Sequence, residues 1–287
     1  MKIGIDNYSY HRYFNEIYPG QSVPDGIWGL SDFVDHILNL PDIELVEGLS
    51  IETCFLPDDD KTILSQLSRL SIPLVFQWGH PDGFMGKTLK DVLEEMKRFL
   101  ELNQRLGCEV LRIVVSSISY FEQPHGPQIS RALDFLEKIL PLAESHAVKI
   151  GLENHADLYL SEISSIIKEF DSPFLGAVLD TGNFVRLKNN PRKAISVFGE
   201  KVYLVHAKDV SIMPGYSPDD PQKYGCVPAG QGDIDFPGIF EDLRSISYDG
   251  MVLLEISRMH PDFEWMGEIK MLSRGLRYLH SLRAEKD

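Results

Sequence analysis

Four short apolar segments of the sequence each end on a residue that can bind a cation. The segments are GLE, VLD, LVH and LLE, and they end at Glu153, Asp180, His206 and Glu255. Three carboxylates and one imidazole form a mostly oxygen donor set, which suits Mn²⁺, Mg²⁺ or Co²⁺ better than the thiolate-rich sets of structural zinc. We therefore predict one divalent metal ion bound by these four side chains, with Mn²⁺ as the first choice.

The spacing of these residues indicates how they could meet. Glu153 and Asp180 are 27 residues apart and Asp180 and His206 are 26 apart, each about one strand plus one helix. From His206 to Glu255 the distance is 49 residues, and the surplus is Val210–Asp235, a stretch rich in Gly, Pro and Asp that is typical of an active-site loop. A single carboxylate at a strand end is commonly a helix cap or a salt-bridge partner. Three carboxylates and one histidine that all end apolar segments of this kind favour a metal site.

The elements that must position these residues alternate along the whole chain. The predicted strands are Lys2–Asp6, Leu45–Glu52, Pro73–Trp78, Val110–Val115, Lys149–Glu153, Leu175–Asp180, Val202–Ala207 and Met251–Glu255. The predicted helices are Ser31–Asn39, Asp58–Leu70, Thr88–Leu106, Gln128–His146, Leu158–Phe170, Pro191–Phe198, Phe236–Ile246 and Asp262–Leu282. Suitable end signals are Ser31 with Asp32, Asn190 before Pro191, and Gly107.

Eight apolar strands alternating with eight helices predict a parallel sheet with helical crossovers. Runs such as LVFQ, RIVV and MVLL lack polar alternation, which indicates burial on both faces. The local pattern also fits an open doubly wound sheet, but the count of eight with a terminal helix favours closure. We predict a single (β/α)₈ TIM barrel over residues 1–287, with the active site where the carboxyl ends of the strands open.

Composition and charge narrow the class of partner. The formal net charge is −15 and no dense basic patch is present, which disfavours nucleic acid. The first ten residues contain one lysine and only a short apolar run, so we expect no signal peptide, and no run is long enough for a membrane span. Three scattered cysteines are typical of reduced thiols. We expect a cytoplasmic enzyme with a small-molecule substrate.

A hard cation bound by two glutamates from different strands indicates proton-transfer chemistry. Four side chains on an octahedral ion leave two positions, which could chelate the adjacent carbonyl and hydroxyl oxygens of a sugar and stabilise an enediolate. Because Glu153 and Glu255 come from different strands, one could remove a proton and the other return it. An epimerase needs two such bases, whereas a 1,2-isomerase can reuse one.

Several further residues are candidates for substrate contact, each with a simpler alternative. His155 lies two positions after Glu153 and could protonate a leaving hydroxyl, or be a loop histidine near solvent. Lys208 could stabilise an enolate oxygen, or be a surface lysine. His80 closes the third predicted strand and could reach substrate. Arg258 could hold a phosphate or carboxylate, or pair with acidic neighbours.

With these residues in place, the sequence resembles the xylose isomerase-like TIM-barrel superfamily of sugar isomerases, ketose 3-epimerases, inosose and dehydroshikimate dehydratases and endonuclease IV type enzymes. The matching segments are GLENH (151–155), LDTGN (179–183), VHAKD (205–209), AGQGDIDF (229–236) and YDGMVLLE (248–255). The resemblance implies the same four metal ligands, with Glu153 and Glu255 doubling as acid and base. Many members have a histidine where this chain has Asn183, so the substrate contact there differs.

These observations lead to a ranked set of functions. The first is a metal-dependent isomerase or epimerase of a sugar or keto-sugar, and the second is a lyase that dehydrates a keto-polyol. An abasic-site nuclease is opposed by the acidic charge and by Asn183, which replaces a zinc ligand such enzymes use. A barrel that binds a metabolite without turnover stays open, as does a homo-oligomer, since members of the superfamily often pair through barrel helices.

Overall fold

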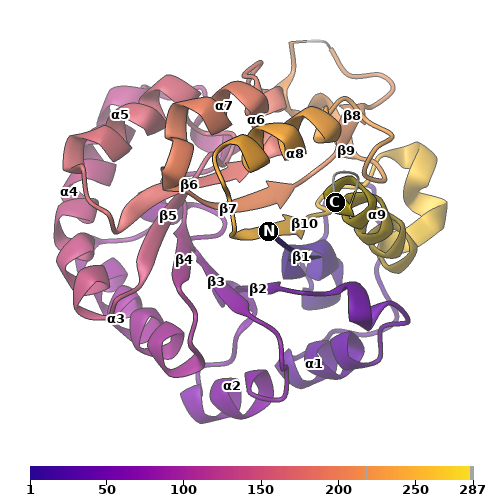
Figure 1. Cartoon of the computed structure of the whole chain (residues 1–287), viewed down its shortest axis with the longest axis horizontal. Helices are drawn as coiled ribbons and strands as arrows, with labels where there is room; N and C mark the ends of the chain where they lie inside the picture. Colours follow the sequence, from indigo (N-terminus) through magenta and orange to yellow (C-terminus); the bar gives the residue numbers. More distant parts are fainter. Residues whose placement is uncertain (218, 285–287) are drawn as a thin grey trace.

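The computed structural model describes residues 1–217 and 219–284 of the chain, whose eight parallel strands close into a barrel with helices around it (Figure 1). The barrel strands are β1 (Lys2–Ile5), β2 (Leu49–Glu52), β3 (Leu74–Trp78), β4 (Val110–Ile113), β5 (Lys149–Glu153), β6 (Leu175–Asp180), β7 (Val202–Ala207) and β10 (Met251–Leu254). Their order around the ring is β1-β10-β7-β6-β5-β4-β3-β2. The predicted single (β/α)₈ barrel is confirmed.

The helices follow the predicted order and pack outside the strands (Figure 1). They are α1 (Leu30–Leu38), α2 (Asp60–Leu67), α3 (Leu89–Leu106), α4 (His125–Ser145), α5 (Leu160–Phe170), α6 (Thr181–Arg186), α7 (Pro191–Phe198), α8 (Phe236–Ser245) and α9 (Gly267–Ala284). Two predicted end signals are confirmed: Asn190 caps α7, and Gly107 ends α3 at φ +69°. At α1 the N-cap is Gly29 instead of Ser31, and Asp32 accepts the Gly29 N–H.

The structure differs from the prediction after the sixth and seventh strands. The short helix α6 follows β6 directly, and no helix was predicted there. The stretch 210–235 is not irregular throughout, because β8 (Val210–Ile212) and β9 (Tyr224–Cys226) pair as an antiparallel two-stranded sheet. Strands of three residues are stabilised by their pairing more than by their own sequence, so the Gly- and Pro-rich composition concealed them.

The core explains why the strands are continuously apolar. Inside the barrel, Val75, Val178, Leu204 and Leu253 form one buried layer from four strands, and a second, larger cluster fills the space between strands and helices. Burial on both faces is therefore the rule, as the apolar runs predicted. At the closure between β1 and β2 the backbones approach closely, because a Cβ on Gly4 would lie 1.9 Å from the Gly48 carbonyl oxygen.

Polar side chains extend the strand pairing at the carboxyl-end rim. Asn154 joins β5 to β6 by donating to the Asp180 carbonyl (2.9 Å) and accepting from the Asp180 N–H (2.8 Å). Thr181 joins β6 to β7 through a hydroxyl that accepts from the Lys208 N–H (2.9 Å). Asn7 accepts from the N–H of Glu52 (2.8 Å) across β1 and β2. These bonds fix the backbone where the predicted metal ligands stand.

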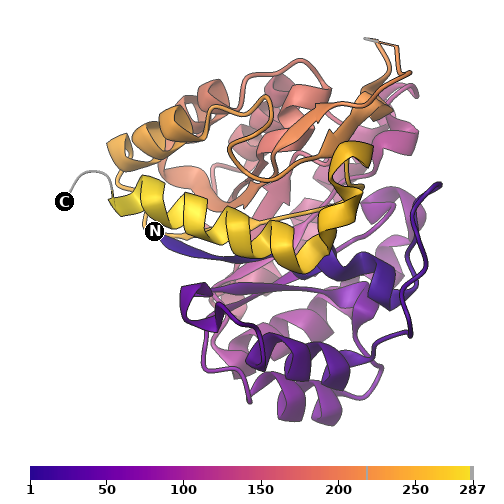
Figure 2. The same cartoon turned by 90° about the vertical axis from the view of Figure 1, so that its right-hand side faces the viewer.

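Two segments that connect barrel elements lie on the side of the molecule opposite the chain termini (Figure 2). Turned by 90°, the molecule shows the indigo loop after β1 and the orange β8–β9 sheet at the side away from the two termini (Figure 2). Cys54, Cys108 and Cys226 are free thiols, two of them buried. Within the described ranges, no helix combines the length and apolar character needed to cross a lipid bilayer.

Candidate metal centre

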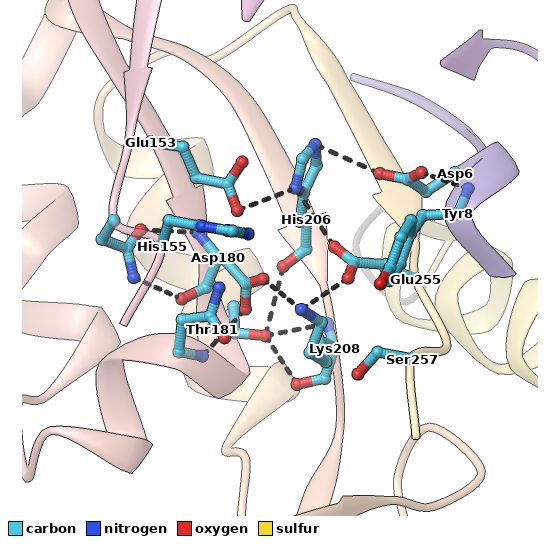
Figure 3. A network of polar contacts seen from close by, with 12 residues as sticks. Asp6, Tyr8, Glu153, His155, Asp180, Thr181, His206, Lys208, Glu255 and Ser257 are labelled. Carbon is cyan, nitrogen blue, oxygen red and sulfur yellow. Dashed lines mark hydrogen bonds and ion pairs between the residues drawn. The ribbon is translucent and has the colours of Figure 1, made fainter. Parts of the chain in front are cut away.

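The four predicted ligands converge at the carboxyl-end rim of the barrel. Each offers a donor atom within 4.8 Å of the donor atoms of the other three, and all four side chains are buried. They stand at the ends of β5 and β6, within β7 and directly after β10, and Figure 3 shows them facing one another. The predicted gathering of Glu153, Asp180, His206 and Glu255 is therefore observed, although their distances along the chain are large.

The imidazole of His206 is the centre of this group. Its Nδ1 lies 3.5 Å from Glu153 Oε1 and 3.3 Å from Glu255 Oε2, and the side chain is fully buried. Neither ring nitrogen has a hydrogen-bond partner among the described residues. Buried polar atoms are nearly always satisfied in folded proteins, so an orphaned Nδ1 between two carboxylates indicates that a ligand belongs there.

The donor spacing fits a divalent cation. Ligands about 2.1 Å from an octahedral ion lie about 3 Å apart when adjacent and about 4.2 Å apart when opposite. The observed separations of 3.3 and 3.5 Å, and the 4.8 Å limit for the whole set, are close to those values. Carboxylate oxygens with one imidazole nitrogen are ligands that Mn²⁺, Mg²⁺, Co²⁺ and Zn²⁺ all accept.

Asp6 stands behind His206, on the side away from the carboxylates. Its Oδ2 lies 3.4 Å from His206 Nε2, and the residue is fully buried after β1 (Figure 3). Gln77 donates to the same oxygen (2.6 Å), and the Tyr8 N–H donates to Oδ1 (2.8 Å). A carboxylate on the far nitrogen of a metal-binding histidine fixes the ring and makes Nδ1 a better ligand. Asp6 is therefore a positioning residue.

Glu153 is held from behind by Arg112, a buried residue of β4. The guanidinium contacts Glu153 through Nε, and its Nη1 lies 3.3 Å from Glu52 Oε1. Burial raises the pKa of Glu153, but the positive charges of Arg112 and His206 outweigh it and hold the pKa well below its usual range. Burial instead prevails at Glu52, whose pKa rises to about 7. Of the two glutamates beside Arg112, Glu153 is thus the ionised one and Glu52 the more readily protonated one.

Lys208 bridges two of the candidate ligands. Its Nζ donates to Asp180 Oδ2 (2.6 Å) and lies 2.5 Å from Glu255 Oε1 (Figure 3). Burial raises the pKa of Glu255, but Lys208 outweighs it and lowers the pKa to about 2. At Asp180, burial and the charges of Glu255 and Glu153 outweigh the same lysine and raise the pKa to about 6. Crowded negative charge of this kind is what a divalent cation relieves.

A cavity of about 420 Å³ opens above the cluster, a size that suits a small metabolite. All five residues predicted for substrate contact or acid–base work outside the four ligands line it: His80, His155, Asn183, Lys208 and Arg258. None of these five predicted residues lies outside the cavity. The simpler alternative of a surface lysine is wrong for Lys208, which is buried.

The two histidines of the cavity differ in their hydrogen bonds. His155 Nδ1 lies 2.9 Å from the Ser116 carbonyl oxygen, which can only accept, so Nδ1 carries the proton and Nε2 of the neutral ring is a free base. His80 Nε2 instead lies 2.7 Å from Glu16 Oε1. The rings meet edge to face, with centroids 6.2 Å apart. Burial lowers the pKa of His155 to about 4, whereas Glu16 and Glu52 outweigh burial at His80 and raise its pKa, so His155 is the more readily neutral of the two.

Asn183 and Arg258 lie at different depths. Asn183 is buried on α6, and its N–H donates to Asp180 Oδ1 (2.9 Å), so Asp180 caps that helix and faces the cluster at once. Arg258 is half-buried after β10 and donates to the Tyr216 hydroxyl (2.7 Å). Asp209 is not in the cavity: it accepts from the N–H groups of 230, 231, 232 and 234 and holds the glycine-rich loop.

Sequence reasoning missed two contributors to the site. Asp6 ends the first predicted strand in the same way as the four ligands end theirs, and that signal was available. Arg186 ends a helix that was not predicted, and no local signal marked it.

A model of the xylose isomerase-like TIM barrel matches residues 58–281, well over half of the chain. The chain belongs to this family. The resemblance inferred from the sequence is therefore confirmed, and it now extends into the first half, where the sequence had shown only strand alternation.

Characterised relatives in this family carry out different reactions. The chain is 25% identical over 53% of its length to 3-oxo-isoapionate decarboxylase of Pectobacterium atrosepticum, and over 61% to 3-dehydroshikimate dehydratase of Pseudomonas putida, also at 25%. It is 23% identical over 57% to L-ribulose-5-phosphate 3-epimerase of Escherichia coli O1:K1 / APEC. The matches span 53%, 27% and 55% of those proteins.

Solved structures share the whole fold at lower identity. The IolI protein, solved with a zinc atom bound, superposes with a TM-score of 0.72 at 18% identity, covering 100% of this chain and 99% of that one. Similarity at this level establishes the barrel and its strand order, and the chemistry has to be argued from the site.

Proposed function

We propose that this protein is a divalent-metal-dependent isomerase or epimerase that acts on a sugar or keto-sugar through an enediolate. The observation that carries the proposal is the buried set Glu153, Asp180, His206 and Glu255 around an unsatisfied Nδ1. Similarity to an epimerase supports the reaction class, and the zinc bound in IolI supports a metal. We propose Mn²⁺ as the physiological ion, with Mg²⁺ or Co²⁺ as substitutes.

The order of strands supports two-base chemistry. The four ligands stand on the consecutive strands β5, β6, β7 and β10, and Glu153 and Glu255 are at the two ends of this arc. A carbon held over the arc would therefore have one carboxylate on each side. When bound, the cation would polarise the substrate carbonyl and so acidify the neighbouring C–H.

The residues around the two carboxylates prepare them for proton transfer. Arg112 keeps Glu153 ionised, so that it can accept a proton from carbon. Lys208 does the same for Glu255 and also places an ammonium group at the cavity floor, where it can stabilise negative charge that develops on a substrate oxygen. We assign Glu153 and Glu255 as the two bases and Lys208 as the electrostatic partner.

A dehydratase is the second candidate, and His155 favours it. The residue lines the cavity, and its Nδ1–H is held by the Ser116 carbonyl, which leaves Nε2 as the basic nitrogen of the neutral ring. After deprotonation next to the carbonyl, loss of a β-hydroxyl needs a proton donor at that oxygen, and a histidine that has accepted a proton at Nε2 would supply it. Similarity to a dehydratase supports this alternative. An abasic-site nuclease is disfavoured by Asn183 and by the acidic charge.

The test is isotope exchange in D₂O with a panel of ketoses and keto-polyols, using enzyme loaded with Mn²⁺. We expect deuterium to enter one carbon next to the carbonyl, and the exchange to stop in Glu153→Gln and after metal removal. An enone absorbance that grows with time would identify the dehydratase. The matched control is Glu101→Gln, an exposed glutamate on α3. If no member of the panel exchanges, the isomerase and epimerase proposal fails.

A further inference from the structure

Two arginines at the outer part of the cavity are not used by the proposed chemistry. Arg186 is the last residue of α6, six positions after Asp180, and Arg258 lies three positions after Glu255. Both line the same cavity and both are half-buried. Arg186 follows β6, which ends at Asp180, and Arg258 follows β10, so both come from segments that continue from the carboxyl-end rim of the barrel.

The cavity holds no acidic partner for these arginines. Three glutamates line it, and each already contacts a cationic or histidine side chain: Glu255 with Lys208, Glu52 with Arg112, and Glu16 with His80. Among the residues that the structure describes, no carboxylate forms a salt bridge with either arginine. In a chain with a net charge of −15, two unpaired guanidinium groups in one pocket are unusual and call for an explanation.

The hydrogen bonds of the two arginines are also incomplete. The Nε of Arg186 is buried and has no hydrogen-bond partner within residues 1–217 and 219–284. Arg258 donates through Nη1 to the Tyr216 hydroxyl (2.7 Å), and its guanidinium lies 5.4 Å from the centre of the Tyr216 ring. This contact fixes the arginine against the segment before β9, and the part of the chain that the structure describes offers no hydrogen-bond acceptor to its other N–H groups. Arginine has five donors in a planar fork that matches carboxylate and phosphate oxygens.

The field of Arg186 reaches into the cavity. Burial raises the pKa of Tyr18, a residue lining the same pocket, and the charges of Arg186 and Lys208 oppose that rise. Arg186 is therefore close enough to act on other groups that line the cavity. A ligand held at the cluster would meet this charge at its other end.

We propose that Arg186 and Arg258 form an anion subsite, and that the substrate is a sugar or keto-polyol with a carboxylate or phosphate group at the end remote from the reacting carbon. This deepens the proposed function and rests on it for the position of the reacting carbon. The anion satisfies the buried Nε of Arg186, and it fixes which carbon lies above Glu153 and Glu255. The two arginines are specificity residues and take no part in proton transfer.

The experiment compares matched substrates on the Mn²⁺-loaded enzyme. Each set contains a neutral ketose, its terminal phosphate ester and the corresponding terminal keto acid, and the variants are Arg186→Gln and Arg258→Gln. We expect the KM of the preferred anionic member to rise about tenfold or more in each variant, with kcat little changed and the KM of the neutral member unaffected. The matched control is Arg105→Gln, which removes an exposed charge at the end of α3. Comparison of the phosphate ester with the keto acid identifies which anionic group the subsite binds.

A binding measurement separates this inference from the proposed function. Calorimetry with inorganic phosphate and with malonate needs no turnover. We expect binding to the wild type and to Arg105→Gln, and at least tenfold weaker binding to both test variants. Loss of anion binding in the variants without turnover of any sugar would uphold the subsite and reject the isomerase. If anions bind the wild type and both variants equally, or if the variants treat neutral and anionic substrates alike, the subsite does not exist. Arg186→Lys, which keeps the charge, should recover part of the affinity.

Discussion

Replacing Asp6 by asparagine tests whether the residue behind His206 supports a metal ion. If an ion is bound at Nδ1, the Nε2 of His206 must carry a proton, and Asp6 Oδ2 at 3.4 Å is its acceptor. In Asp6→Asn the side-chain oxygen can still accept the Tyr8 N–H, as Oδ1 does now at 2.8 Å. The amide NH₂ then faces the ring N–H, so a donor meets a donor.

The size of this effect follows from the bond that is lost. A hydrogen bond to a charged, fully buried group contributes about 1.5 to 3 kcal/mol, which corresponds to about 10- to 100-fold in affinity. The same range is typical when outer partners of metal-binding histidines are removed. We therefore expect the Kd for Mn²⁺ to rise by that factor in Asp6→Asn, measured by competition with a fluorescent chelator on metal-free enzyme.

The control for this measurement is Asp134→Asn, which neutralises an exposed carboxylate on α4. Circular dichroism should report the wild-type fold for both variants. A folded Asp6→Asn protein that binds Mn²⁺ as tightly as the wild type would refute the assignment of Nδ1 as a ligand and of Asp6 as its support.

Two further predictions concern stability. Burial raises the pKa of Glu47, but the Arg283 guanidinium and the Ile3 N–H outweigh it, so the folded-state pKa is lowered. The stabilisation is then present above the unfolded pKa of about 4.3 and is lost as pH falls through the folded value. Urea unfolding from pH 7 to 3 should show that the difference in unfolding free energy between the wild type and Glu47→Gln shrinks on acidification. A difference that stays constant with pH would contradict the prediction. Gly4→Ala should destabilise by about 3 kcal/mol or more in the same assay, because its Cβ would lie 1.9 Å from the Gly48 oxygen; a cost under about 1 kcal/mol would mean that β1 and β2 separate easily.

The four candidate metal ligands could be predicted as a group because the position of a residue at a strand end determines where it lies in a parallel barrel. In a parallel barrel every strand opens on the same rim, so residues that end apolar runs meet in space whatever their separation in sequence. That logic placed Glu153, Asp180, His206 and Glu255 correctly relative to one another. The same logic applied to the first strand would have added Asp6.

The contacts around the cluster were not predictable in the same way. Asp180 caps α6 and also faces the candidate cation site, and no pattern in the sequence indicates that one aspartate would do both. The bridge formed by Lys208 depends on the backbone beyond β7, where the Thr181 hydroxyl holds the chain. Arg186 reaches the cavity only because a short helix follows β6.

The position of a bound ion tests the central claim most directly. Crystals of the protein loaded with Mn²⁺, measured at the manganese absorption edge, should show one anomalous peak per chain, about 2.1 to 2.2 Å from His206 Nδ1 and from carboxylate oxygens of Glu153, Asp180 and Glu255. Elemental analysis should give one ion per chain, and none in Asp180→Ala. A peak elsewhere, or a chain that stays free of metal at millimolar Mn²⁺, would contradict the account.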